Sequence, residues 1–381
     1  MKRVVILCVA ILLVLGAVFF AKAQKLQGSK FYFPLKLKPE PAGSFCELRS
    51  DHFHGGVDYR TNQKEGYSLY AMEKGKIVRA SVSEKGYGKA LYIQYDNGYQ
   101  SVYAHLKKFN RNVEKLLRKD MRHSGSKTAN LINLDIPVKR KQKVAVAGNS
   151  GSSSGPHLHL EIRSHYQTPA DKIMLYNPQK YFPVTDDVAP KFYYLGVYGI
   201  SSRQISYLPV PVSQLLSMPQ TAEPAGFQEF AEFTASAIFL DTLHLSSGHY
   251  AFGISALDTV NNLPFNYGLY RLCFMMDNDT LAYYSLDSFP LSNYSKVSLH
   301  TDSEFQKQYK KKMEKSWVFP EDAALSPYSV INNNGICLLE DPECIYTLKI
   351  YGSDFNGNTT VLVQPVRLYE PVKLDELKDP R

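Results

Sequence analysis

A meander of short strands joined by tight turns is the feature that most constrains the fold of this chain. Two strands are predicted over Gly75–Val82 and Lys89–Asp96, with the turn residues Gly86-Tyr87-Gly88 between them. Asn97-Gly98 then predicts a two-residue hairpin turn into a third strand over Tyr99–Leu106. Aromatic residues make up 13% of the sequence, and they favour strands over helices. The sequence therefore predicts a mainly β fold.

The rest of the first half of the chain fits the same small domain. A short basic helix with a solvated face is expected between Arg111 and Arg122. Two more strands, over Val144–Ala147 and His157–Arg163, flank a glycine-serine run from Gly148 to Gly155. We therefore expect residues 44–182 to form a small antiparallel β-sheet domain.

The second half changes to short strands separated by turn signals. This spacing is typical of a β-sandwich, immunoglobulin-like in a loose sense, which we expect over residues 190–381. A basic helix is expected over Ser303–Ser316, with Phe305, Tyr309 and Met313 packed on the sandwich. The length of 381 residues also favours more than one domain. The predicted strands are Phe192–Tyr198, Phe230–Leu240, Tyr250–Asp258, Tyr270–Met276, Thr280–Ser285, Tyr346–Ser353 and Thr360–Arg367.

The N-terminus has the pattern of a secretory signal peptide. Lys2-Arg3 is followed by an apolar stretch from Val4 to Phe20, and Ala21-Lys22-Ala23 has the small-x-small form of a cleavage site. We expect residues 1–23 to be removed, which leaves residues 24–43 as an N-terminal arm and places the protein in the periplasm or cell envelope. A retained membrane anchor is the alternative, because the apolar stretch nearly spans a bilayer.

The net charge is mildly basic. The chain has 44 Lys and Arg against 36 Asp and Glu, a formal charge of +8 that falls to +5 without the three basic residues of the signal peptide. Mild basicity suits an anionic polymer outside the cytoplasm, and it gives no support to nucleic-acid binding.

Four cysteines follow the predicted signal peptide, namely Cys46, Cys273, Cys337 and Cys344. In an oxidising compartment we expect Cys337 to pair with Cys344, because the two bracket the turn-like residues 340–343. The other two pairings stay open. The sequence has no C-x-x-C pair, so it does not support a cysteine-ligated zinc site.

Histidine clustering is the strongest chemical signal in the sequence. Seven of the ten histidines lie between residues 52 and 165, which is less than a third of the chain. The clustered residues are His52, His54, His105, His123, His157, His159 and His165.

Within this cluster, spacing brings possible metal ligands together. His157-Leu158-His159 lies in an alternating strand, so both imidazoles project from one face. His54-Gly55-Gly56-Val57-Asp58 adds a nitrogen and a carboxylate, and its glycines let the backbone bend so that these side chains converge. Two histidines and a carboxylate with an open fourth position form the ligand set of a hydrolytic zinc site. His105, on the same strand face as Tyr103, is placed to join them.

Taken together, these motifs resemble the lysostaphin/LytM-type zinc metallopeptidases over residues 44–182. The matching motifs are His54-x-x-x-Asp58, Tyr103-Ala104-His105-Leu106, and Gly148-Asn149-Ser150-Gly151 running into Ser154-Gly155-Pro156-His157-Leu158-His159-Leu160-Glu161. The resemblance implies that His54, Asp58 and His159 hold one zinc ion per chain. It also implies that His105 and His157 are the catalytic pair.

The resemblance implies an activity as well. The family's usual substrate is the peptide part of peptidoglycan, so we expect a zinc-dependent metalloendopeptidase whose glycine-serine run forms one wall of a substrate groove. In such a site zinc activates a water, and His105 or His157 handles its proton. The stretch Phe45–Arg60 and the β-rich tail are similar to envelope members from Bacteroidetes-like bacteria, and an envelope protein is the partner we expect for the C-terminal region.

Two features depart from the family pattern. A basic insertion occupies Arg111–Asn133, and Lys141-Gln142-Lys143 stands where members usually have a glycine turn. Both would change the groove walls without removing a ligand. Of the remaining histidines, His52 is expected to support the site or contact substrate, whereas His123 and His165 are expected on the surface.

Two rival interpretations were weighed. Gly151–Gly155 formally matches the nucleophile elbow of a serine hydrolase, but that motif requires a helix directly after the serine, and here Pro156 and a strand follow. A non-catalytic or latent cell-wall-binding or regulatory protein on the same scaffold is the alternative. Degenerate copies usually lose a ligand or a catalytic histidine, and this sequence retains all of them.

Overall fold

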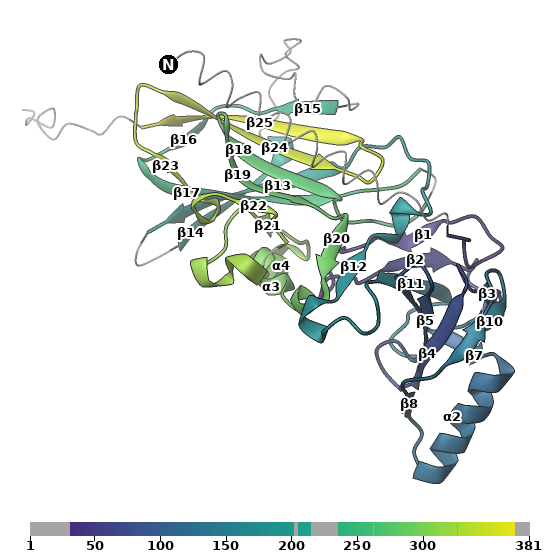
Figure 1. The fold of residues 1–381 in the computed structure, drawn as a ribbon. Coiled ribbons are helices and arrows are strands. Elements are labelled where there is room, and N and C mark those ends of the chain that lie inside the picture. Colours follow the sequence, from purple (N-terminus) through teal and green to yellow (C-terminus); the bar gives the residue numbers. More distant parts are fainter. Residues whose placement is uncertain (1–30, 202–204, 215–234, 262, 326, 370–381) are drawn as a thin grey trace, which may run out of the picture.

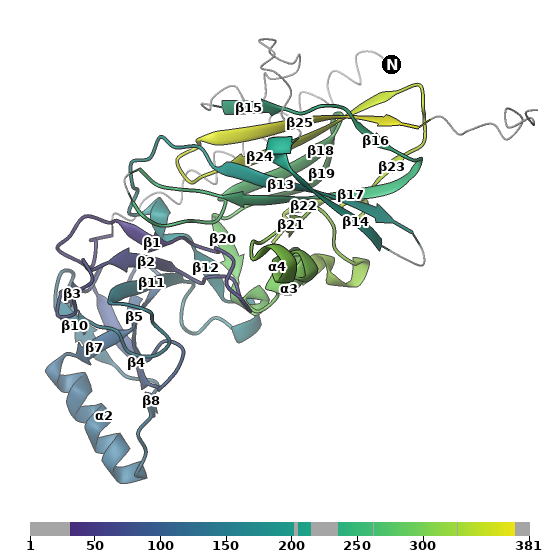
Figure 2. The same cartoon turned by 180° about the vertical axis from the view of Figure 1, so that it is seen from behind.

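The computed structural model describes residues 31–201, 205–214, 235–261, 263–325 and 327–369. They form two β-rich regions, a smaller one from the first half of the chain and a larger one from the second half (Figures 1 and 2). The prediction of a mainly β chain is confirmed. The predicted signal peptide lies outside the described residues.

The smaller region is built on an antiparallel sheet whose main path runs β1-β2-β11-β6-β5-β4-β8. The predicted meander is confirmed as β4, β5 and β6, which pair in sequence order. The strands of the path are β1 Pro41–Gly43, β2 Val57–Arg60, β4 Gly75–Val82, β5 Lys89–Tyr95, β6 Gln100–Ala104, β8 Ala129–Leu131 and β11 His157–Arg163, and β9 Ile136–Val138 pairs with β4.

A second, 3-stranded sheet and one helix complete this region. The sheet contains β3 Ser68–Tyr70, β7 Leu106–Phe109 and β10 Lys143–Ala147. The predicted basic helix is confirmed as α2 Arg111–Ser124, which begins at Asn110, whose side chain accepts a hydrogen bond from the Val113 amide. It buries Val113 and Leu117 and ends at Gly125 in the left-handed conformation. Figure 1 shows α2 at the outer end of the region. The basic side chains of α2 are exposed.

The described part of the N-terminal arm packs against this region. Phe31 and Leu35 are buried in its core, and the Tyr32 amide donates to the Met72 carbonyl at 3.0 Å. Pro41–Gly43 then pairs with β2 as an edge strand of the main sheet. Residues 31–43 therefore contribute apolar contacts and backbone hydrogen bonds to the sheet that carries the site.

The larger region contains two sheets, which fit the predicted β-sandwich. A strand lies at each of the seven predicted positions, although residues 230–234 of the strand predicted over Phe230–Leu240 lie outside the described residues. These strands are β13 Lys191–Ile200, β15 Ala235–Phe239, β17 Gly248–Leu257, β18 Arg271–Met276, β19 Asp279–Ser285, β24 Ile345–Ser353 and β25 Thr359–Leu368. The additional strands are β14 Ile205–Pro211, β16 Leu243–Leu245, β21 Glu314–Lys315, β22 Val330–Ile331 and β23 Cys337–Leu339.

The two regions share a sheet. In the larger region β20 Ser288–Pro290 leaves the sandwich and pairs with β12 Met174–Tyr176, which itself pairs with β11. The segment that follows includes α3 Val297–His300 and lies beside the smaller region in both views (Figures 1 and 2). Because β11 carries two histidines of the predicted site, this pairing brings the larger region close to the site.

Three sequence expectations are wrong. The loop between β5 and β6 has three residues, Asp96, Asn97 and Gly98, rather than the predicted two, because Gln94 pairs with Gln100 and the Tyr95 amide donates to the Tyr99 carbonyl. The helix predicted over Ser303–Ser316 is only α4 Ser303–Tyr309, because Lys310 takes a left-handed conformation and Glu314–Lys315 instead pairs with β17 as β21. Met313 is buried, but it does not lie on the helix.

The predicted Cys337–Cys344 disulfide is also absent, since all four described cysteines are free. Cys337 lies in β23 and its thiol donates to the Tyr250 carbonyl, whereas the exposed thiol of Cys344 donates to Asp341. Separate hydrogen-bond partners thus keep the two thiols apart.

Candidate metal centre and active site

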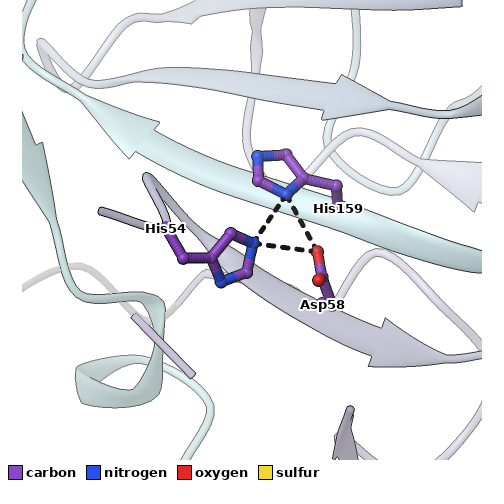
Figure 3. A group of neighbouring side chains, drawn as sticks. All are labelled: His54, Asp58 and His159. Atoms are coloured by element: carbon purple, nitrogen blue, oxygen red, sulfur yellow. Dashed lines mark hydrogen bonds and ion pairs between the residues drawn. The ribbon is translucent and has the colours of Figure 1, made fainter. Parts of the chain in front are cut away.

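Two adjacent strands and one loop bring His54, Asp58 and His159 together (Figure 3). Asp58 in β2 lies directly opposite His159 in β11, so the sheet register alone sets two of the three side chains side by side. His54 comes from the loop that leads into β2. Its Nε2 lies 3.1 Å from Asp58 Oδ1 and 3.0 Å from His159 Nδ1, and the last two atoms are 2.9 Å apart.

This triangle fits a zinc ion. Ligand bonds of about 2.0–2.2 Å around a tetrahedral ion separate the ligand atoms by about 3.3 Å, close to the distances observed. The side chains of His54 and His159 are buried, and the carboxylate of Asp58 is mostly so. Two imidazoles and one carboxylate are also ligands typical of zinc, whereas calcium and magnesium are bound mainly by oxygen atoms.

Outer partners fix the orientation of each candidate ligand. His54 donates its Nδ1 proton to the Ser44 carbonyl at 2.7 Å, which leaves Nε2 free for a metal. Arg49 binds Asp58 Oδ2 at 3.0 Å, so Oδ1 is the oxygen that faces the two histidines. His159 Nε2 lies 2.9 Å from Glu161 Oε1, which directs Nδ1 toward the centre of the triangle.

Glu161 is itself held by a buried network. Arg163 binds its other oxygen through Nε at 2.6 Å, and the Tyr87 hydroxyl donates to Oε1. Burial raises the pKa of Glu161, but the Arg163 charge and the hydrogen bond from His159 outweigh it and lower the value to about 2. Glu161 is therefore a permanent carboxylate that supports His159.

His105 and His157 lie next to the triangle. His157 Nε2 is 3.3 Å from Asp58 Oδ1, and the His105 and His157 rings are 4.8 Å apart between centroids. Each ring donates its Nδ1 proton to a carbonyl at 2.8 Å, Ser150 for His105 and Gly155 for His157. A carbonyl can only accept, so Nε2 of each neutral ring is left unprotonated.

Burial and charge set opposite titration behaviour in neighbouring histidines. Burial, together with repulsion from His159 and His157, lowers the pKa of His105 to about 4. Burial also disfavours the charged form of His159, but its hydrogen bonds to Asp58 and Glu161 overcome this and raise its pKa to about 9. His105 is therefore neutral at pH 7, as a proton acceptor must be.

The site opens into a cavity of about 340 Å³. One wall is the glycine-serine run, which is held on the turn before β5 by hydrogen bonds between Ser152 and Gly86. The opposite rim includes Tyr294 from the larger region, whose ring stacks on His52 with a centroid distance of 4.7 Å. The groove is thus built by both regions.

All five predicted site residues meet at this groove. They are His54, Asp58, His105, His157 and His159. His52 lies on the rim. His123 is exposed on α2, and His165 is half-buried and away from the groove.

Sequence reasoning missed the supporting residues. Glu161 and Arg163 continue the period-two pattern of His157 and His159 in β11, so this alternation was the signal that could have identified them. Arg49, Tyr87 and Tyr294 carry no comparable signal, because they reach the site through tertiary structure.

Comparison with known proteins finds one family that matches part of the smaller region. The model of Peptidase family M23 matches residues 52–121. An uncharacterized metalloprotease of Haemophilus influenzae is 29% identical over 109 residues, which are 29% of this chain and 18% of that protein. The peptidoglycan DD-endopeptidase ShyB of Vibrio cholerae is 32% identical over 110 residues, covering 29% of this chain and 20% of that protein.

Not every relative is named as a peptidase. The murein hydrolase activator NlpD of Salmonella typhimurium is 30% identical over 125 residues, covering 33% of this chain and 26% of that protein. The chain spans less than a third of the length of these curated relatives. A crystal structure of a zinc containing peptidase from Vibrio cholerae aligns with 35% of this chain and 36% of that chain, at 26% identity and a TM-score of 0.27. Within the smaller β-rich region, residues 52–121 thus match Peptidase family M23.

Proposed function

We propose that this chain is a zinc-dependent metalloendopeptidase that hydrolyses peptide bonds in the stem or crosslink peptides of peptidoglycan. The observation that carries the proposal is the triangle of His54 Nε2, Asp58 Oδ1 and His159 Nδ1, with sides of 2.9–3.1 Å, at the floor of an open groove. When bound there, zinc supplies a Lewis acid that lowers the pKa of a water and polarises a carbonyl.

The chain's own groups supply the proton transfers. His105 and His157 each present an unprotonated Nε2 beside the triangle, because their Nδ1 atoms donate to fixed carbonyls. One ring takes the proton of the attacking water and returns it to the leaving amine. The other ring can donate from Nε2 to the oxygen of the tetrahedral intermediate after it has taken up a proton from solvent.

The groove favours small, extended peptides. Its glycine-serine wall offers short side chains and backbone groups, and its rim offers the Tyr294 ring and the Arg49 guanidinium. ShyB, a relative named for peptidoglycan endopeptidase activity, supports this substrate class.

We place the activity in residues 44–182 and the sandwich in residues 190–381, and we propose that the protein works in the cell envelope after export. Within the part of the chain that the structure describes, no helix has the length and apolarity needed to cross a membrane. The alternative is a non-catalytic regulator, which the similarity to the activator NlpD supports.

Hydrolysis of purified peptidoglycan by residues 24–381 tests the proposal. We expect newly freed amino groups that disappear with a chelator, return with zinc, and are absent in His159→Ala. The matched control is His123→Ala, an exposed histidine of α2 that should leave the activity unchanged. Zinc binding without hydrolysis would support the regulatory alternative, and absence of zinc binding would overturn the proposal.

A further inference from the structure

A second cluster of metal-ligating side chains lies outside the histidine site, where the larger region begins. Asp186 belongs to the segment that leads into β13, Asp258 directly follows β17, and Asp354 directly follows β24. One carboxylate oxygen from each lies within 4.8 Å of one from the other two. The three side chains are 8%, 4% and 3% exposed, respectively. Since β17 and β24 belong to different sheets, the cluster joins both layers of the sandwich.

These carboxylates lack compensating charge. Among the described residues, no Lys, Arg or His forms an ion pair with any of the three. Moreover, Asp258 Oδ1 is buried with no hydrogen-bond partner. Buried unpaired charge is costly, so the fold presents an acceptor that needs a proton or a cation. Burial and repulsion by the other two carboxylates raise the pKa of Asp258 to about 8.

The other two carboxylates are held in fixed positions. Asp186 Oδ1 accepts hydrogen bonds from the Val188 amide at 3.2 Å and the Asn261 amide at 3.1 Å. Asp354 accepts from the Asn358 amide at 2.9 Å and from its side chain at 2.7 Å. These bonds fix the positions of two carboxylates in the cluster that contains the partnerless oxygen of Asp258.

We propose that Asp186, Asp258 and Asp354 together bind one calcium ion. All candidate ligands are oxygens, which hard divalent cations prefer. Calcium accepts irregular sets of carboxylate and carbonyl oxygens. Magnesium requires near-ideal octahedral geometry and keeps several bound waters, and a site this deeply buried leaves little room for those waters. The set contains no nitrogen or sulfur, which separates it from the zinc triangle.

The ion would fasten the segment that connects the two regions. The loop after Asp354 already holds this segment, because Asn356 donates to the Val184 carbonyl at 2.7 Å and Asn358 donates to the Asp186 carbonyl at 3.0 Å. A calcium ion bound to Asp186 adds a stronger link between the connecting segment and the ends of β17 and β24. The site is thus structural, and it is independent of the proposed peptidase activity.

Calorimetric titration of chelator-stripped full chain with calcium chloride tests the proposal. We expect one calcium per chain with a Kd between about 1 µM and 1 mM. Saturating calcium should raise Tm by about 5 °C. In Asp258→Asn we expect calcium to bind at least about 10-fold more weakly and to cause no rise in Tm. Without metal, this variant should be at least as stable as the wild type, because the substitution removes the repulsion between Asp258 and the other two carboxylates.

The matched control is Asp187→Asn, which removes an exposed carboxylate from the same segment and should bind calcium like the wild type. Asp354→Asn serves as a second variant should Asp258→Asn not fold. Failure of the wild type to bind calcium would overturn the proposal. Calcium binding that survives in both Asp258→Asn and Asp354→Asn would also overturn it, since the ion would then lie elsewhere, for instance at the intact histidine triangle.

Discussion

The two buried clusters of this chain solve the problem of buried charge in opposite ways. In the smaller region, Asp58 is surrounded by histidines and Arg49, and a buried Glu161–Arg163 pair supports His159. In the larger region, three aspartates face one another with no cation beside them among the described residues. The charges of the first cluster are paired without a metal, whereas the second brings three carboxyl groups together without a paired cation in the described part of the chain.

This difference teaches what each cluster selects. A mixed nitrogen and oxygen set with ordered outer partners suits zinc and leaves a coordination position open for chemistry. An all-carboxylate set suits a hard cation that holds segments together. The comparison also predicts that the zinc site depends on a charged outer partner, Glu161, whereas the outer partners of the proposed calcium site are uncharged amides.

Glu161→Gln should give the largest effect on the first cluster. The amide cannot supply the charge that fixes His159, so we expect zinc affinity to fall about 10–100-fold. Arg163, which is 8% exposed, loses its charged partner, so the free energy of unfolding should fall by about 3 kcal/mol. Competition with a zinc chelator and urea denaturation measure the two effects.

The control for this change is Glu84→Gln, which alters an exposed glutamate. Both quantities should match the wild type in the control. An unchanged zinc affinity in Glu161→Gln would show that outer partners do not distinguish the first cluster from the second.

Gly56→Ala should destabilise the scaffold that brings the ligands together. A Cβ atom at this position would lie 2.3 Å from the Leu160 carbonyl oxygen in β11, so β2 and β11 would have to separate. We expect a loss of about 2 kcal/mol in the free energy of unfolding. In Gly155→Ala the added Cβ would have no atom within 4 Å beyond those of the adjacent residues, so the loss in the free energy of unfolding should be far smaller. Equal losses in the two variants would contradict a role for close strand contact at Gly56.

Tyr294→Ala should give the smallest effect, confined to substrate binding. The ring stacks on His52 at the groove rim and does not contribute to the metal triangle. We expect KM to rise about 5-fold with kcat and zinc content unchanged, and Tyr294→Phe to behave like the wild type. Loss of zinc in Tyr294→Ala would instead mean that the larger region supports the metal centre.

The sequence predicted the elements whose signals are local. The Asn97-Gly98 hairpin, the strands of the meander and helix α2 all depend on turn residues or periodicity within a few positions. The helix predicted through Ser316 was too long because pairing of Glu314–Lys315 with β17 overrides its helical periodicity. The pairing of β20 with β12 had no local signal, since it joins distant parts of the chain.

The same distinction applies to the two clusters. The spacings His54-x-x-x-Asp58 and His157-x-His159 are short motifs, so the sequence brought these residues to attention. Asp186, Asp258 and Asp354 are far apart in the sequence, and each has the appearance of an ordinary turn aspartate. Only the three-dimensional structure brings them together.

The measurement that tests this account most directly is the metal content of the full chain and two variants after equilibration with equimolar zinc and calcium. The account predicts one zinc and one calcium in the wild type, loss of zinc alone in His159→Ala, and loss of calcium alone in Asp258→Asn. Zinc retained in His159→Ala, or zinc lost in Asp258→Asn, would contradict the assignment of zinc to the His54, Asp58 and His159 triangle.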